Sequence, residues 1–250
     1  MVTNEVGDFK ELNQHMDSHV GIYTTDLSKY LTKLDSSETK YPSLSFKSVV
    51  DGKTTYSVLM QSCPAYFVEV LSDNAPTEHD TSDWLVTDEL RFDWTDFEAS
   101  TSDKVVKVSR ATTMLTEMTK FYTEVIGGTV QKSSTSNSGV QTVIVKLTHA
   151  DAVLHFVNRP APTNSMFSVA DLEKYVNGVH DQYVKSTNCG FDQYADHHWA
   201  YDARTNDITL SSISKKLEAG GYKYRWFSLP GNMHQIYAFD PSGWTFQLDL

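Results

Sequence analysis

In residues 16–73, apolar and polar residues are spaced first as in a strand, then as in a helix, and then as in three further strands. An alternating run at His19–Thr25 is followed by apolar residues at helical spacing and then by three further alternating runs. Alternation is typical of a half-buried strand, whereas apolar residues three or four positions apart mark one face of a helix. The Asp51-Gly52 pair between two alternating runs is a strong hairpin signal. Residues 16–73 therefore predict a β-α-β-β-β module.

The same order recurs twice. In residues 104–157 a strand-like run precedes a helix that ends at Gly127-Gly128, and three more strand-like runs follow. In residues 195–250 a strand precedes a helix that ends at Gly220-Gly221, and a hairpin and a last strand follow. Glycine pairs are typical of helix ends, because glycine adopts the left-handed conformation there. Three such modules predict an α+β protein.

Two connectors separate the modules, which occupy residues 1–73, 104–157 and 195–250. Residues 74–103 are acidic, contain Trp84 and Trp94, and do not repeat the module pattern. Residues 158–194 contain an amphipathic pattern that predicts a helix over about 169–185.

Composition narrows the class of partner. The 250 residues carry a formal net charge of −11, which disfavours nucleic acid and membrane surfaces as partners, because both reward clustered Lys and Arg. Two cysteines do not make a disulfide scaffold, and the chain starts without a basic and apolar leader pattern. No apolar run approaches the ~20 residues of a membrane span. A cytoplasmic protein that binds a small molecule is therefore expected.

Three passages carry a family resemblance: His19–Leu27 at the start of a module, Phe121–Gly128 at a helix end, and Asp240–Leu248 (DPSGWTFQL) at the last hairpin. Together they resemble the vicinal-oxygen-chelate superfamily, which includes glyoxalase I, extradiol dioxygenases and bleomycin-resistance proteins. The resemblance covers the three modules, about two thirds of the chain. It implies modules paired into U-shaped, mostly antiparallel sheets with helices on the outer face.

The resemblance also implies a divalent metal, held by one residue on the first strand and one on the last strand of each paired module. The matching positions are His19 and Glu69, Lys107 and His155, and His198 and Gln247. Imidazole with carboxylate or amide oxygen suits Fe, Zn, Mn, Co or Ni. A protonated lysine is a poor ligand, and the superfamily usually has Glu where Gln247 stands.

The odd number of modules leaves their pairing open. Pairing modules two and three would bring together His155, His198 and Gln247. Pairing modules one and three would bring together a chemically better set, which we prefer: His19, Glu69, His198 and Gln247. A homodimer that pairs the remaining module is a further alternative.

These ligands favour a metal-dependent enzyme, a lyase, isomerase or dioxygenase, acting on a small oxygenated organic substrate. The metal would bind two adjacent substrate oxygens and act as a Lewis acid. The alternative, motivated by Lys107 and Gln247, is a metal-free protein of the same fold that binds or sequesters a small molecule. A purely structural or interaction protein is a third interpretation.

Other residues are candidates for catalysis or substrate binding. Glu69 lies in an apolar strand, where a carboxylate is costly unless it is paired or bound, and His234 near a hairpin is a candidate general acid or base. Substrate-binding candidates are His155, Lys107, Tyr201 and Tyr237. For His155 a structural role, as a hydrogen-bonded core histidine, is favoured over ligand binding. Core packing is the default for both tyrosines.

Overall fold

The structure is a computed structural model that describes residues 19–37, 43–63, 66–93, 103–159, 199–204, 208–231 and 233–250. The helix expected over 169–185 lies outside these residues. The chain divides into two compact units. Unit 1 comprises Met1–Thr113, Val130–Lys146 and Asp151–Pro162, and unit 2 comprises Met114–Thr129, Leu147–Ala150 and Thr163–Leu250. No helix in the described part of the chain is long and apolar enough to cross a membrane.

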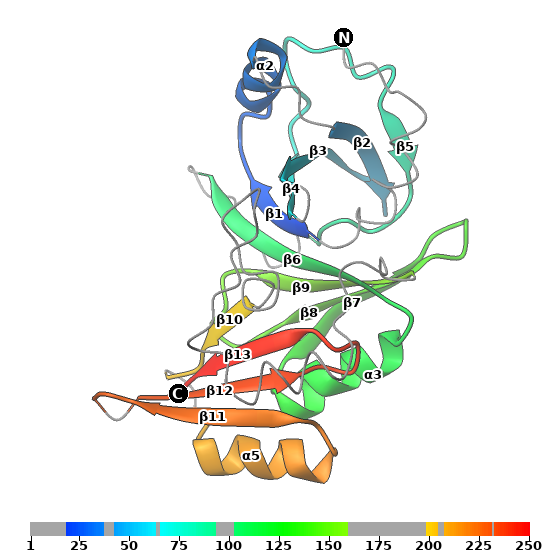
Figure 1. Cartoon of the computed structure of the whole chain (residues 1–250). Helices are drawn as coiled ribbons and strands as arrows, with labels where there is room; N and C mark the ends of the chain where they lie inside the picture. Colours follow the sequence, from blue (N-terminus) through cyan, green and yellow to red (C-terminus); the bar gives the residue numbers. More distant parts are fainter. Residues whose placement is uncertain are drawn as a thin grey trace. The chain divides into compact units, whose positions relative to one another are not determined.

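Unit 1 contains a nine-stranded sheet in the order β5-β2-β3-β4-β1-β6-β9-β8-β7 (Figure 1). The strands of the first module and its connector are β1 (His19–Tyr23), β2 (Ser43–Val50), β3 (Lys53–Cys63), β4 (Tyr66–Ser72) and β5 (Leu85–Thr87). Those of the second module are β6 (Lys104–Thr112), β7 (Thr129–Thr135), β8 (Gln141–Lys146) and β9 (Val153–Asn158).

Unit 2 contains a four-stranded sheet in the order β10-β13-β12-β11. Its strands are β10 (Trp199–Asp202), β11 (Tyr224–Leu229), β12 (Met233–Phe239) and β13 (Thr245–Asp249), and helix α5 spans Leu210–Ala219. In every module the first strand lies parallel to the last, and hairpins complete the sheet. The predicted α+β class with repeated modules is therefore confirmed.

The two faces of the unit 1 sheet differ. Helix α2 (Ser28–Ser36) covers one face, where Tyr30, Leu31 and Leu34 pack on a cluster of Leu27, Val58 and Val70. The other face carries the side chains of alternate residues, including His19 and Glu69. The predicted Asp51-Gly52 hairpin joins β2 and β3, and both residues have positive φ, as a tight hairpin turn requires.

The helix of the second module belongs to unit 2. It consists of α3 (Leu115–Lys120) and a π-helical turn, η1 (Phe121–Val125), and Gly127, with φ of 94°, follows its C-cap residue Ile126. The Tyr122 hydroxyl donates to Asp240 Oδ2 at 3.0 Å. Asp240 Oδ1 in turn accepts from the backbone N–H of Ser242 and Trp244, which closes the turn of the DPSG motif. This explains the motif's conformation without any ligand.

The pairing of modules differs from the one we preferred. β1 and β6 pair antiparallel, so the first module shares a sheet with the second. The preference for modules one and three was wrong for His19 and Glu69, because it rested on ligand chemistry. Strand pairing between sequence-distant segments is set by backbone hydrogen bonds along whole strands, which ligand chemistry does not report.

Candidate polar centre

Strand register relates the two modules of unit 1 by a local two-fold axis. On β1 and β6, His19 lies opposite Ser109 and Gly21 lies opposite Lys107. Rotation about an axis between these pairs exchanges His19 with Lys107. Glu69 lies beside Gly21 on the next strand, and His155 lies beside Ser109. His19 and Glu69 are thus equivalent in position to Lys107 and His155.

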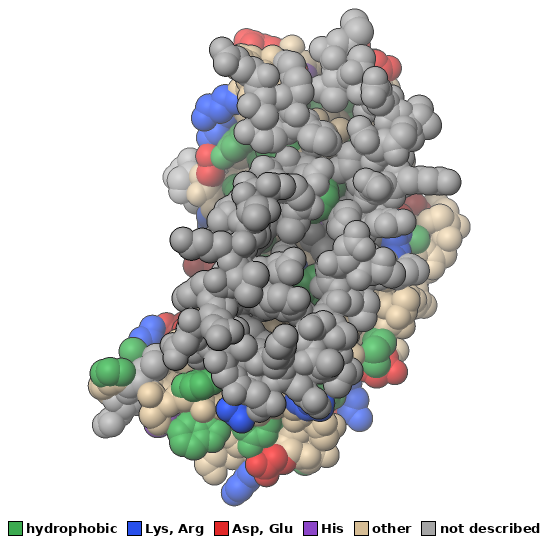
Figure 2. Space-filling model, viewed as in Figure 1, with side chains coloured by type: hydrophobic (Ala, Val, Ile, Leu, Met, Phe, Trp, Pro, Cys, Tyr) green, Lys and Arg blue, Asp and Glu red, His purple; other side chains and the backbone are tan. Residues whose placement is uncertain are grey.

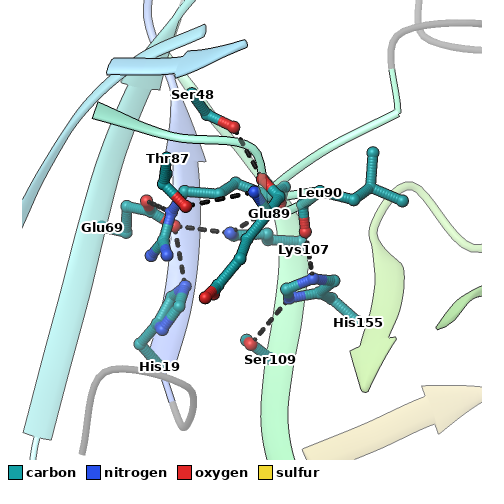
Figure 3. A network of polar contacts seen from close by, with 10 residues as sticks. His19, Ser48, Glu69, Thr87, Glu89, Leu90, Lys107, Ser109 and His155 are labelled. Carbon is teal, nitrogen blue, oxygen red and sulfur yellow. Dashed lines mark hydrogen bonds and ion pairs between the residues drawn. The ribbon is translucent and has the colours of Figure 1, made fainter. Parts of the chain in front are cut away.

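Glu69 is at the centre of a buried ionic network (Figure 3). Its Oε2 atom lies 2.8 Å from His19 Nε2 and 2.5 Å from Lys107 Nζ. Its Oε1 atom accepts from Arg91 Nε at 2.6 Å. The side chains of His19, Glu69 and Lys107 are fully buried, and that of Arg91 is 3% exposed. Both carboxylate oxygens therefore bind cationic side chains inside the protein.

His155 extends this network into the second module. Its Nε2 atom lies 2.7 Å from the Leu90 carbonyl oxygen, which only accepts, so Nε2 carries the proton. Nδ1 then accepts from Ser109 Oγ at 2.9 Å. Both ring nitrogens are engaged, so His155 is placed as a hydrogen-bonded core histidine.

The protonation states follow from burial and charge. Burial and the positive charge of Lys107 lower the pKa of His19 to about 4, against the opposing effect of Glu69. Burial alone would raise the pKa of Glu69, but the charges of Arg91 and Lys107 hold it well below its usual value. Burial, Lys107 and Arg91 also lower the pKa of His155. At neutral pH the centre therefore contains one carboxylate, two cations and two neutral imidazoles.

The connecting segment packs against strands of both modules beside this centre. Leu90 and Phe92 pack in one cluster with Leu71, Ile144 and Val153, which come from strands of both modules. The Arg91 carbonyl accepts from Lys107 Nζ at 2.8 Å. Sequence reasoning missed Arg91 because the connector was interpreted as an acidic linker. The alternation of Leu90, Arg91 and Phe92 was the available signal of a strand-like, partly buried segment.

A divalent metal does not fit the residues at this position. Two cations occupy the Glu69 oxygens, and the His155 nitrogens bind protein atoms. A metal would have to approach an ammonium and a guanidinium without a second carboxylate to offset them. In the part of the chain that the structure describes, no three His, Cys, Asp or Glu side chains are grouped to hold a metal.

Gly21 gives Lys107 the space to reach Glu69. A Cβ atom at Gly21 would lie 2.4 Å from Lys107 Cγ and 2.8 Å from Cε, closer than carbon atoms approach. We expect Gly21→Ala to reduce the free energy of unfolding by about 1–3 kcal/mol, since a packed interior yields little to added volume. Urea denaturation measures this loss. The loss should shrink in a Lys107→Ala background, and an equal loss in both backgrounds would contradict the steric explanation.

The third module places its candidates on two faces of its sheet. Gln247 on β13 lies opposite Tyr237 on β12 and beside Ala200 on β10, so Gln247 and Tyr237 share a face. Tyr201 and His234 alternate to the other face. The Tyr201 hydroxyl donates to the Thr148 carbonyl, and His234 Nδ1 lies 3.2 Å from Ser228 Oγ. His198 lies outside the described residues.

A carboxylate orients two amides on the Gln247 face. Asp249 Oδ1 accepts from Gln247 Nε2 at 2.8 Å and from Gln235 Nε2 at 3.0 Å. Because both amides donate through nitrogen, their oxygens point away from Asp249. Among the described residues, neither amide oxygen accepts a hydrogen bond. This face therefore presents two oriented acceptors beside the Tyr237 ring.

Comparison with known proteins supports the fold. No family model and no curated protein matches the chain. Glyoxalase I from Zea mays matches in structure with 15% identity and a TM-score of 0.55, over 93% of this chain and 66% of that chain. Two variants of that maize enzyme match with 14% and 16% identity and TM-scores of 0.55 and 0.54. Each match covers 93% of this chain, and 67% and 66% of the respective maize chains.

The chain thus spans about two thirds of the length of the maize enzymes. At this identity the match concerns the fold, and it agrees with the module topology seen in both sheets. The resemblance predicted from the sequence is therefore confirmed: the chain has the fold of the vicinal-oxygen-chelate superfamily.

Proposed function

We propose that this chain is a small-molecule-binding protein of the vicinal-oxygen-chelate fold that holds no divalent metal between its paired modules. The observation that carries the proposal is the 2.5 Å contact of Lys107 Nζ with Glu69 Oε2. This ion pair occupies positions at which the superfamily resemblance implies metal ligands. It supports the metal-free alternative over the metal-dependent enzyme for the first two modules.

The proposed ligand contacts lie on the third module. Tyr237 and the amide oxygens of Gln235 and Gln247 share one sheet face, and Asp249 fixes both amides. Such a face suits hydroxyl groups of a small oxygenated organic molecule, since amide oxygens accept hydrogen bonds. By contrast, the polar groups around Glu69 in the first two modules are buried and bind one another.

We propose no nucleic acid partner. Among the described residues visible in Figure 2, basic and acidic side chains are interspersed rather than separated by sign. Together with the net charge of −11, the described residues of that face offer no cluster of basic side chains for a phosphate backbone.

A second candidate function is a metal-dependent lyase, isomerase or dioxygenase centred on the third module. Gln247 lies on the last strand of that module, at the position where a ligand is implied, and its amide oxygen is oriented. His198 would be the first-strand ligand. If a metal is held there, it supplies Lewis-acid polarisation of two adjacent substrate oxygens.

Metal analysis and ligand screening separate the two functions. We expect purified protein to contain no stoichiometric divalent metal. A screen of catechols, 2-hydroxy acids and 2-oxo aldehydes by thermal shift should give a ligand whose binding survives EDTA. Gln247→Ala should weaken that binding about 5-fold, since one hydrogen bond contributes about 1 kcal/mol. Gln141→Ala, an exposed position on β8, is the matched control.

Three results count against the proposal. Stoichiometric metal lost in His198→Ala but retained in His19→Ala would favour the enzyme of the third module. Metal lost in His19→Ala or Glu69→Gln would contradict the metal-free centre of the first two modules. Ligand binding that EDTA abolishes would contradict metal-free binding.

A further inference from the structure

The buried centre of unit 1 contains more positive than negative charge. Glu69 provides one negative charge, and Lys107 and Arg91 each provide one positive charge within 2.6 Å of its oxygens. The two cations together carry the charge of one divalent ion. They come from different segments, since Lys107 lies on β6 of the second module and Arg91 lies in the connector.

Neighbouring residues position both cations. The aliphatic part of Lys107 lies across Gly21. At this position any residue with a Cβ atom would collide with the lysine side chain. The Arg91 guanidinium lies 4.5 Å from the centroid of the Phe46 ring, a cation–π distance. Lys107 also donates to the Arg91 carbonyl, so one cation positions the backbone of the other. Placement of this kind indicates a built site rather than a chance surface pair.

We propose that Lys107 and Arg91 together substitute for the divalent cation of this fold, with Glu69 and His19 as the ligand pair that they satisfy. The inference rests on the proposed metal-free function and deepens it for the first two modules. The guanidinium and the ammonium contact the two oxygens through which Glu69 would hold a metal. Because both cations are side chains of the protein itself, they cannot dissociate as a metal ion can, and this centre needs no supply of metal.

Removal of both cations should expose a latent metal site. In Arg91→Ala/Lys107→Ala, the fully buried Glu69 carboxylate would lose both of its cationic partners and keep only the His19 imidazole, a costly state. A divalent ion bound by Glu69 and His19 Nε2 would restore the charge balance of the natural protein. Carboxylate and imidazole are suitable ligands for Co²⁺.

The test is titration of the double variant with Co²⁺, followed by visible absorption and thermal unfolding. We expect one more Co²⁺ per chain than in the natural protein, with visible d–d bands and a higher Tm in its presence. Adding Glu69→Gln should remove the extra site. Equal Co²⁺ binding by the natural protein and the soluble double variant, or extra binding that survives Glu69→Gln, would overturn the proposal.

Loss of folding is also informative. If the double variant is insoluble, refolding with Co²⁺ should recover it and refolding with EDTA should not. Failure to recover it in Co²⁺ would overturn the proposal. A different result would contradict the proposed function: metal that the natural protein holds and that His198→Ala loses. That result would not change the difference in Co²⁺ binding expected at Glu69.

Discussion

Glu69→Gln should reduce the free energy of unfolding by about 3–5 kcal/mol, the range for breaking a buried ion pair by removing one partner. The amide keeps the size of the side chain but removes its charge. Lys107 and Arg91 would then lie close together, buried, without a counterion. Urea denaturation gives the total loss, and amide hydrogen exchange of β1 and β4 peptides locates it in unit 1.

Asp51→Asn is the matched control, because it makes the same change of charge in the same unit. Asp51 Oδ2 pairs with Lys132 Nζ at 2.6 Å, but its side chain is 69% exposed. Solvent screens such a pair, so the loss should be about 0–1 kcal/mol. Asparagine also suits the left-handed φ of this turn position. Equal losses in the two variants would mean that the Glu69 network contributes no more than a surface pair.

A double variant distinguishes two causes of the destabilisation: the loss of the ion pairs of Glu69, and the burial of cations without a counterion. Lys107→Met in the Glu69→Gln background removes one of the two cations and keeps an unbranched side chain in the channel beside Gly21. If most of the loss comes from buried charge without a partner, the double variant should be more stable than Glu69→Gln alone. A double variant that is less stable would indicate that packing of the lysine stem dominates.

The helices and strands of the fold could be predicted from local sequence. The ion pairs around Glu69 could not. Period-two and helical spacing predicted all three modules, because each depends on which face of a segment is buried. His19, Glu69, Lys107 and His155 were correctly recognised as residues at comparable strand positions. Their role was harder to predict, since the ion pairs that Glu69 makes with Arg91 and Lys107 join residues 22 and 38 positions apart along the chain.

Lys107 shows why residue chemistry alone misled the choice of module pairing. As a single residue it is a poor metal ligand, which made the second module look like an unsuitable partner. In the structure the same property makes it the counterion of Glu69. Burial of a charge on one strand predicts that an opposite charge lies near, but not which strand carries it. Only the β1–β6 register identifies the partner.

The second large effect is a loss of stability in mild acid. His19 has a pKa of about 4 in the folded protein, below the ordinary 6.5, and the pKa of His155 is also well below 6.5. Between pH 6.5 and about 4 the unfolded chain binds protons at both histidines and the folded chain does not. Falling pH therefore favours the unfolded state, by about 1.4 kcal/mol per pH unit for each histidine. Glu69, whose pKa is lowered below its usual value, adds a loss of its own only at the acid end of this window, where the carboxyl of the unfolded chain begins to bind a proton.

Stability measured by urea denaturation should thus fall more steeply between pH 6 and 5 than above pH 7, and the two histidines together should contribute up to roughly 3 kcal/mol per pH unit, because each binds a proton on unfolding. His155→Gln should reduce this slope by one proton, and His19→Gln should do the same. His79→Gln is the matched control, since His79 is partly exposed and is not part of the network. A slope that none of the network substitutions changes would show that both imidazoles take up protons in the folded protein, which their burial and the positive charge of Lys107 oppose.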